Sequence, residues 1–438
     1  MRSLATSEHP TVRAVSAFIG TVSSGGRARQ FSRVMRRMGA APASIVPRVQ
    51  DSPNFRDGRF QSAEPSLRPR VKAQTSALLA AVRVHQRGRP VGTVPIVAAQ
   101  HPERPGDLAV TWYGHATSVL EVDGVRFLID PVFGERVSPV LRTGPKRLHP
   151  VPGQIEDLPP IDAVLLSHDH YDHLDEPSIA RLERSHRPHY VVPLGVDAHL
   201  LAWGVDEDRV TALDWRGSTD VGTVHVTCTE ARHNSGRGFI DSQTLWAGWA
   251  LRGPRHSAYF SGDSGTSKRF AAIGADLGPF DLTLMPVGAY DPYWPDIHMD
   301  PEQAVAAHRD VNRIGSDAEG VTADAAGEAD DFLPEEHRID TPGGAHEEGE
   351  PSSDGHRVAT AARRSVLVPV HWATFNLAMH WWSEPVRRTR AAAAAAGVPV
   401  ACPRVGERVD LTIGEPDEVA RKFNEQWWEE CAAPEDRD

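Results

Sequence analysis

A chain of 438 residues is long enough for one large domain or for two to three ordinary ones. The net charge is −12, which does not indicate the strongly basic surface of a nucleic-acid-binding protein. No uninterrupted apolar run reaches about 18 residues, so we expect no transmembrane helix. The three cysteines are far apart and odd in number, which argues against a disulfide framework and favours a reducing cytoplasm.

The first part of the chain is rich in Arg, Pro and Ser and shows no clear strand alternation. We expect residues 1–105 to form an N-terminal arm of helices and extended chain that packs on the main domain. A short helix is predicted at Ser76–Val84. The weak apolar patch Ala14–Val22 has no convincing cleavage site after it, so a signal peptide is not expected.

From Leu108 onwards, short segments rich in Val, Leu, Ile and aromatic residues are typical of strands. We expect a main domain over residues 106–414 and a helical tail over 415–438. Asp123-Gly124 joins two of the segments and is a strong hairpin-turn signal. Strands are predicted at Leu108–Tyr113, Ser118–Val122, Arg126–Ile129, Tyr190–Val192, Val224–Thr229, Thr244–Leu251, Ser257–Ser261, Leu282–Pro286 and Val366–Val370. Helices are predicted at Glu176–Arg184, Val196–Trp203, Pro301–Asn312 and Glu384–Ala396. This interleaving favours a layered α/β domain.

Residues 315–363 form an acidic window between a predicted helix and a predicted strand. Thirteen acidic residues face three arginines there, so this window carries about −10 of the net charge. Few large apolar residues accompany them, which predicts a disordered inserted loop. A tolerated surface insertion is the favoured interpretation, and a lid or partner-binding segment is the alternative.

The segment Ser167–Asp175 reads Ser-His-Asp-His-Tyr-Asp-His-Leu-Asp and says the most about function. The apolar run Ile161–Leu166 before it is typical of a buried strand, and α/β sheets place chemistry at the ends of such strands. Imidazole and carboxylate groups both suit zinc, whereas a metal-free polar loop is the alternative. The motif H-x-H-x-D-H within this segment consists of His168, His170, Asp172 and His173.

Three further polar residues follow later predicted strands: His233, Asp263 and His371. Taken alone, His233 fits a surface or core histidine better than a ligand, and Asp263 fits a turn residue equally well. The glycines beside Asp263 allow close backbone approach. Four strand-end positions in this order together indicate a metal site.

This order of residues resembles the metallo-β-lactamase superfamily over roughly Leu108–Val400. The resemblance implies an αββα four-layer sandwich of the α/β class with two Zn²⁺ ions, other divalent metals being the alternative. Two such ions about 3.5–4 Å apart can share a hydroxide that acts as nucleophile at neutral pH. By the same resemblance, the first metal is held by His168, His170 and His233, the second by Asp172, His173 and His371, and Asp263 bridges the two.

Longer blocks of sequence allow a finer comparison. They are Trp112–Thr117, Asp130–Phe133, Gly144–Arg147, Leu158–Val164, Gly278–Leu282, Pro286–Tyr290 and His298–Ala304. These blocks resemble the N-acyl-phosphatidylethanolamine-hydrolysing phospholipase D group. The resemblance implies that a metal-bound hydroxide cleaves a phosphodiester bond in that phospholipid or a related one. Asp172, Asp263 and His298 are then the catalytic residues, with His298 near the phosphate or, alternatively, a turn residue before the next helix. His115 is expected to support the site.

The first 100 residues and the acidic window depart from the group's pattern, which leaves the exact lipid open. A lactonase similar to the ascorbate-6-phosphate lactonases, or another small phosphodiester or ester hydrolase, is the alternative function. A diiron redox module is disfavoured because such proteins usually carry Glu where this chain has His170. The expected partner is a phospholipid or other phosphodiester and not a nucleic acid. A cytoplasmic protein is expected. Peripheral contact with the inner face of the membrane and assembly into a homodimer are both left open. Two tryptophan pairs, Trp381-Trp382 and Trp427-Trp428, are interpreted as packed anchors with membrane contact as the alternative, and Cys228 as a buried apolar residue.

Overall fold

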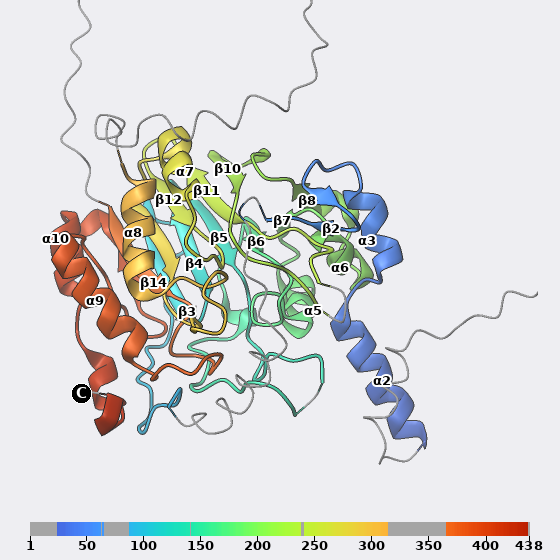
Figure 1. Cartoon of the computed structure of the whole chain (residues 1–438), viewed down its shortest axis with the longest axis horizontal. Helices are drawn as coiled ribbons and strands as arrows, with labels where there is room; N and C mark the ends of the chain where they lie inside the picture. Colours follow the sequence, from blue (N-terminus) through green and yellow to red (C-terminus); the bar gives the residue numbers. More distant parts are fainter. Residues whose placement is uncertain are drawn as a thin grey trace, which may run out of the picture.

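Two β-sheets face each other in the computed structural model, and helices cover their outer faces (Figure 1). The structure describes residues 24–62, 64, 87–140, 142–237, 241–313 and 365–436. The apolar patch at 14–22, the expected helix at 76–84 and the acidic window 315–363 lie outside these residues. The layering confirms the α/β class and the αββα sandwich that the sequence predicted.

Within the described residues, the larger sheet has seven strands in the order β15-β3-β4-β5-β6-β7-β8. Neighbouring strands are antiparallel from β15 to β5 and parallel from β5 to β8. The β4–β5 hairpin turns at Asp123-Gly124, as the sequence predicted. The strands are β3 (Leu108–Gly114), β4 (Thr117–Val122), β5 (Val125–Ile129), β6 (Ala163–Leu165), β7 (His189–Pro193), β8 (Val210–Leu213) and β15 (Arg408–Asp410).

The smaller sheet contains six strands from the described part of the chain, in the order β14-β13-β12-β11-β10-β9. Strands β12 to β14 are parallel, and the others are antiparallel. The strands are β9 (Ser218–Val221), β10 (Val224–Thr229), β11 (Gly248–Arg252), β12 (Ser257–Phe260), β13 (Leu282–Pro286) and β14 (Val366–Val370).

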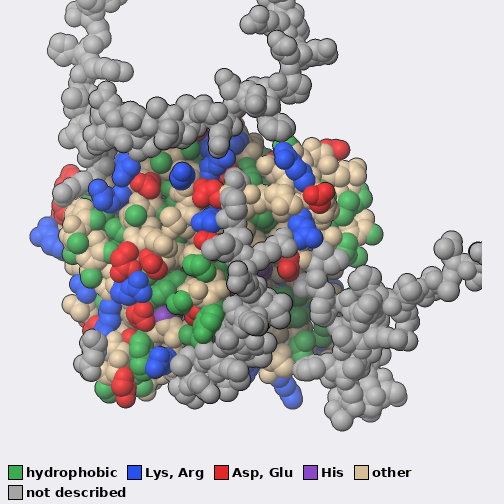
Figure 2. Space-filling view, viewed as in Figure 1, with side chains coloured by type: hydrophobic (Ala, Val, Ile, Leu, Met, Phe, Trp, Pro, Cys, Tyr) green, Lys and Arg blue, Asp and Glu red, His purple; other side chains and the backbone are tan. Residues whose placement is uncertain are grey.

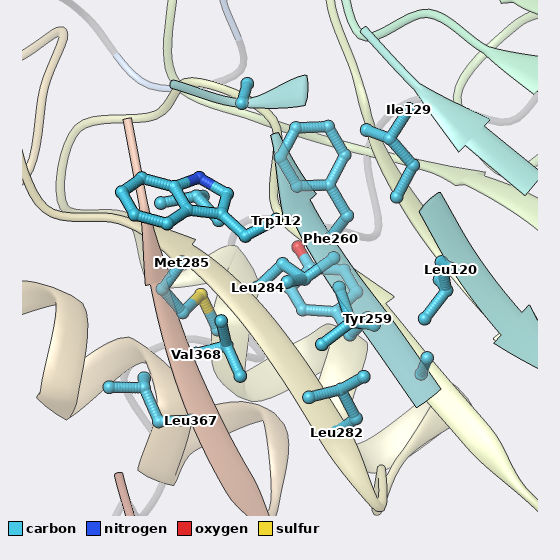
Figure 3. Close-up of a cluster of buried hydrophobic side chains, with 14 of the residues drawn as sticks. Trp112, Leu120, Ile129, Tyr259, Phe260, Leu282, Leu284, Met285, Leu367 and Val368 are labelled. Atoms are coloured by element: carbon cyan, nitrogen blue, oxygen red, sulfur yellow. The ribbon is translucent and has the colours of Figure 1, made fainter. Parts of the chain in front are cut away.

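The main core lies between the two sheets, where strands of both contribute side chains (Figure 3). Because successive strand residues point to opposite faces, alternate positions of each strand enter this layer. Removing this apolar surface from water is the main source of the fold's stability. Fully buried examples are Trp112, Leu120 and Ile129 from the larger sheet and Phe260, Leu284 and Val368 from the smaller one.

Helices cover both outer faces. In Figure 1, α8 and α9 lie on one side of the sheets, and α5 and α6 lie on the other. Asp175 caps α5 by accepting a hydrogen bond from the Ser178 amide, and Asp300 with Gln303 forms a capping box at α8. None of the described helices is long and apolar enough to cross a membrane. The helices are α5 (Glu176–Ser185), α6 (Val196–Ala202), α7 (Arg269–Leu277), α8 (Pro301–Val311) and α9 (Glu384–Ala396).

The two ends of the described chain pack on this sandwich. Near the N-terminus, α3 (Pro42–Val49) contacts α6, after α2 (Ser24–Met38) and before the short hairpin of β1 (Phe55–Arg56) and β2 (Arg59–Phe60). At the other end, α10 (Pro416–Lys422) precedes Trp427, whose ring stacks on Trp372 at 5.3 Å. On the face in Figure 2, basic and acidic side chains are interspersed, so the described atoms there form no continuous basic region.

Most of the predicted elements agree with the structure to within about two residues. One strand was placed wrongly at its start: Thr244–Leu251 was predicted, but the strand β11 begins at Gly248, because residues 244–247 are not paired in the sheet. Cys228 is buried, as predicted. Trp382, Trp427 and Trp428 are also buried, whereas Trp381 remains partly exposed.

Candidate metal centre

The candidate ligands meet at one edge of the sandwich, on loops that follow strands. The H-x-H-x-D-H motif follows β6, His233 follows β10, Asp263 follows β12 and His371 follows β14 directly. Before Asp263, Gly262 has φ +59° and a Cβ there would lie 2.3 Å from the Ala247 carbonyl oxygen, so the chain can pass this close only with glycine. The seven predicted ligands lie in overlapping groups of His and Asp side chains and so form one cluster.

Asp263 lies at the centre of this cluster. Its Oδ2 atom is 3.1 Å from Nε2 of both His173 and His371. On the other side, the same oxygen is 4.0 Å from Nε2 of His168 and 3.8 Å from Nε2 of His233. One carboxylate oxygen thus faces two groups of imidazoles at once.

Each of these two groups contains a further residue of the motif. His170 Nδ1 lies 2.9 Å from His168 Nε2 and 3.3 Å from His233 Nε2, which places the three imidazoles together. Asp172 Oδ2 lies 3.5 Å from His371 Nε2, in the other group. The geometry therefore brings His170 to His168 and His233, and Asp172 to His371, while His168 also approaches His173 with 4.2 Å between the ring centroids.

His115 supports the second group from the loop between β3 and β4. Its Nε2 atom lies 2.9 Å from Asp172 Oδ2, and its ring centroid is 3.9 Å from that of His371. Its backbone amide donates to the Thr374 hydroxyl at 2.6 Å. These contacts place His115 where the sequence expected a supporting residue, with its side chain fixing the orientation of Asp172.

The two carboxylates of the cluster are ionised, and two of its imidazoles are protonated beside them. Burial raises the pKa of Asp172 and Asp263, but the neighbouring His173 outweighs it and holds the pKa of both carboxyl groups well below the ordinary range. Burial lowers the pKa of His371, but Asp263 and Asp172 outweigh burial and raise it to about 9. The pKa of His173 is raised for the same reason. The two carboxylates are thus compensated by protons that a divalent cation can replace.

The other imidazoles of the cluster are held neutral. Burial lowers the pKa of His168 and His233 well below the usual value. Burial also lowers the pKa of His298 to about 4 and that of His115 to about 3. A neutral imidazole offers a nitrogen lone pair, which is the form that binds a metal.

The donor set fits a bound metal. The buried Asp263 and the partly buried Asp172 lie among histidines, which is the nitrogen and oxygen set that Zn²⁺ prefers. Within the described residues, Oδ1 of Asp263 is buried and has no hydrogen-bond partner. Buried polar atoms are normally paired, so an unpaired carboxylate oxygen at this point is consistent with a cation site.

Residues behind the cluster orient its imidazoles. His173 Nδ1 lies 2.7 Å from Asp130 Oδ2, and His233 Nδ1 lies 2.8 Å from the Ile297 carbonyl oxygen. An imidazole that donates its Nδ1–H in this way presents its Nε2 lone pair to the cluster. The sequence analysis assigned no such role to Asp130, although this residue follows a predicted strand, as the ligands do.

Three residues at the site adopt left-handed backbone conformations. The φ angles are +39° for Asp130, +54° for His115 and +64° for His371. Such conformations are costly for residues other than glycine and tend to occur where function requires them. They turn the chain sharply at the ends of β5, β3 and β14 and aim these three side chains into the cluster.

Comparison with known proteins agrees with this geometry. The Beta-lactamase superfamily domain matches residues 125–316. An uncharacterized protein of Mycobacterium tuberculosis is 43% identical over 86% of this chain and 89% of its own length. The N-acyl-phosphatidylethanolamine-hydrolyzing phospholipase D 1 of Caenorhabditis elegans is 38% identical over 51% of this chain and 67% of its own length.

The chain belongs to the metallo-β-lactamase superfamily, among its N-acyl-phosphatidylethanolamine-hydrolysing phospholipase D-like proteins. It is a metal-dependent hydrolase. A mitochondrial relative in Saccharomyces cerevisiae, also named N-acyl-phosphatidylethanolamine-hydrolyzing phospholipase D, is 32% identical over 46% of this chain and 44% of its own length.

In this metallo-β-lactamase superfamily member, a buried arginine connects the loop that carries the H-x-H-x-D-H motif, residues 168–173, to the N-terminal arm by hydrogen bonds. Arg237 Nη1 donates to the carbonyl oxygens of Asp169 at 2.7 Å and Leu174 at 2.6 Å. Its Nη2 donates to the Arg37 carbonyl oxygen at 2.7 Å, at the end of α2. Asp169 stands between the predicted ligands His168 and His170, so Arg237 fixes the backbone that carries them. No sequence signal marked this residue.

Arg237→Gln should therefore weaken metal binding. Partners that only orient ligands typically contribute roughly 10–100-fold in metal affinity or activity, and we expect a loss in this range. The affinity is measured by zinc competition with a fluorescent chelator. Arg209→Gln is the control, because Arg209 is a partly buried arginine that pairs with Glu183, away from residues 168–173. Equal affinities for the two variants would show that Arg237 does not position the ligands.

A cavity of about 560 Å³ adjoins the cluster at His298. Its walls come from the loop between β13 and α8, from the start of α9 and from the chain at Arg87. Tyr290, Tyr293 and Met379 supply apolar surface, and the charged groups of the lining are two arginines and three carboxylates, Asp291, Asp300 and Glu384. His298 is the predicted site residue that belongs to both the cluster and the cavity, since its Nδ1 atom lies 3.9 Å from Asp263 Oδ2.

Proposed function

We propose that this protein is a binuclear zinc hydrolase of the phospholipase D type. Its substrate is N-acyl-phosphatidylethanolamine or a related phospholipid, and the bond cleaved is the phosphodiester bond to the N-acylethanolamine. The main support for this proposal is the similarity to the C. elegans phospholipase D. The chain is 38% identical to that protein over 67% of its length. The division of the donors around Asp263 supports two metals rather than one.

The roles of the residues follow from their positions. His168, His170 and His233 would hold one ion, Asp172, His173 and His371 would hold the other, and Asp263 would lie between them. Two such ions supply a water of lowered pKa and positive charge against the attacked phosphoryl oxygens. Asp172 and Asp263 keep that charge in place because they are ionised throughout the neutral range.

His298 binds the phosphate in this proposal. It stands where the cluster meets the cavity, and burial lowers its pKa to about 4, so the imidazole is neutral at physiological pH. A neutral imidazole donates one N–H hydrogen bond and adds no charge. Nδ1 of His298 is buried and has no hydrogen-bond partner among the described residues, so it is available to a substrate oxygen.

The membrane contact of the enzyme is also part of the proposal. A cytoplasmic protein that takes a phospholipid has to meet the inner face of the membrane. Of the two tryptophan pairs, Trp381 is the member that stays partly exposed, and it lies next to the cavity residue His380. Tryptophan is well suited to the membrane interface because its indole ring is largely apolar and carries one polar N–H group. Trp381 is therefore the residue that we expect at the lipid surface.

The test is hydrolysis of N-acyl-phosphatidylethanolamine by zinc-loaded protein in ¹⁸O-labelled water. We expect N-acylethanolamine and phosphatidic acid as products, with the label in the phosphatidic acid because water attacks phosphorus. Asp263→Asn, purified in the same way, controls for contaminating hydrolases. If lactones are opened while this lipid and other phosphodiesters stay intact, the protein is a lactonase and the proposal is wrong.

A further inference from the structure

The cavity beside the cluster contains two guanidinium groups, and they differ in how their charge is compensated. Arg388 pairs with Glu302 at 2.6 Å and with Glu384 at 3.0 Å, and its guanidinium lies over Tyr290 at 5.0 Å. Two carboxylates already accept hydrogen bonds from this arginine, so its role is to hold the cavity wall together. Its charge is therefore not free for a ligand.

Arg87, the other arginine, is exposed within the cavity wall. Its guanidinium lies over the ring of Trp381 at 5.0 Å. Within the described residues, no carboxylate lies within ion-pair distance of it. A guanidinium that stacks on an aromatic ring keeps its N–H donors at the edge, where they remain available for hydrogen bonds.

The backbone fixes Arg87 in this position. The Trp382 amide donates to the Arg87 carbonyl oxygen at 2.9 Å. The next residue, Gly88, is packed so closely that a Cβ there would lie 2.1 Å from the Asn376 side-chain oxygen. Arg87 is thus held in place before any ligand arrives, which reduces the entropy lost on binding.

We propose that Arg87 binds an anionic phosphate oxygen of the substrate in this cavity, and that it selects anionic phosphodiesters over neutral esters. This inference rests on the proposed function. A guanidinium presents two parallel N–H donors that match two oxygens of one phosphate. Because the cavity is also bounded by His298, a phosphodiester that enters it lies between a cationic donor and a neutral one. Arg87 then contributes to substrate binding and not to the cleavage step.

The test compares Arg87→Gln with Arg89→Gln. Arg89 is exposed on the same segment and does not line the cavity, so its loss removes the same charge nearby. The substrate is a short-chain, water-soluble N-acyl-phosphatidylethanolamine, and its methyl phosphotriester is a neutral competitive inhibitor of nearly the same shape. We expect Arg87→Gln to raise KM for the anionic substrate roughly 10- to 100-fold, as for the loss of a hydrogen bond between charged groups. The inhibition constant of the triester and kcat should stay within about twofold. Arg87→Lys should recover part of the loss, because it keeps the charge but not the paired donors.

The outcomes separate the two proposals. If Arg87→Gln and Arg89→Gln change KM equally, or if binding of the triester weakens as much as that of the diester, the assignment of Arg87 is wrong while the proposed function stands. If wild-type protein with its full metal content turns over no phosphodiester, both are wrong. Metal content and melting temperature are measured for every variant, so that a damaged fold is recognised.

Discussion

Asp263→Asn should abolish hydrolysis while leaving the fold intact. The carboxylate lies between two groups of imidazoles, at 3.1 Å from His173 and His371 and at about 4 Å from His168 and His233. Loss of a residue that only orients a ligand typically costs roughly 10–100-fold, so loss of the central carboxylate should cost more. The amide keeps the shape of the side chain but removes the negative charge that holds two cations together. Metal content should fall in parallel.

Asp123→Asn is the matched control for this variant. Asp123 is likewise a buried carboxylate beside a histidine, with 2.7 Å between its Oδ1 and His256 Nδ1. It stands in the β4–β5 hairpin turn, where Asn-Gly is as favourable as Asp-Gly. We expect wild-type turnover and metal content for this control. Turnover by Asp263→Asn within a few-fold of wild type, at full metal content, would falsify the role given to Asp263.

The layered fold and the residues of the His/Asp cluster could be predicted from the sequence because their signals are local. Val224–Thr229, Leu282–Pro286 and Val366–Val370 are short apolar runs that end at polar residues, and the structure has strands at those bounds. The candidate ligands follow such runs directly or within a few residues. Their convergence needs only that the strand ends meet at one edge of the sandwich, which is a general property of this layering.

What could not be predicted depends on contacts between distant segments. The strands β8, β9 and β15 are short edge strands, so their pairing is set by neighbours and not by a local pattern. Arg237 acts through carbonyl groups 63 and 68 residues away in the sequence. Arg87 lines the cavity because Trp382 and Asn376 hold its segment, and nothing in the residues around it indicates this.

The cluster's electrostatics lead to an expected result for the metals themselves. Elemental analysis of active protein should give about two zinc ions per chain. Chelation should abolish activity and lower the melting temperature, because ions that bind the native state stabilise it. One reproducible metal per chain in fully active protein would contradict the binuclear proposal.

The loss of stability on chelation should also grow as the pH rises. In metal-free protein, protons on His173 and His371 compensate Asp172 and Asp263, and the pKa of His371 is raised from 6.5 to about 9. A group whose pKa is raised on folding stabilises the fold fully below its unfolded pKa and loses that contribution as the pH rises through its folded pKa. The melting temperature of metal-free protein should therefore fall between pH 6.5 and pH 9.

Zinc-loaded protein should show a much smaller fall over this range, because the cations replace those protons. The measurement is a pair of thermal melts at each pH, with and without chelator. Metal-free Asp263→Asn is the control: it lacks the carboxylate that contributes most to the raised pKa of His371, so its melting temperature should depend less on pH. Metal-free wild type and metal-free Asp263→Asn could instead lose stability in parallel between pH 6.5 and pH 9. In that case these protons do not compensate the two carboxylates, and the argument that a divalent cation replaces the protons is wrong.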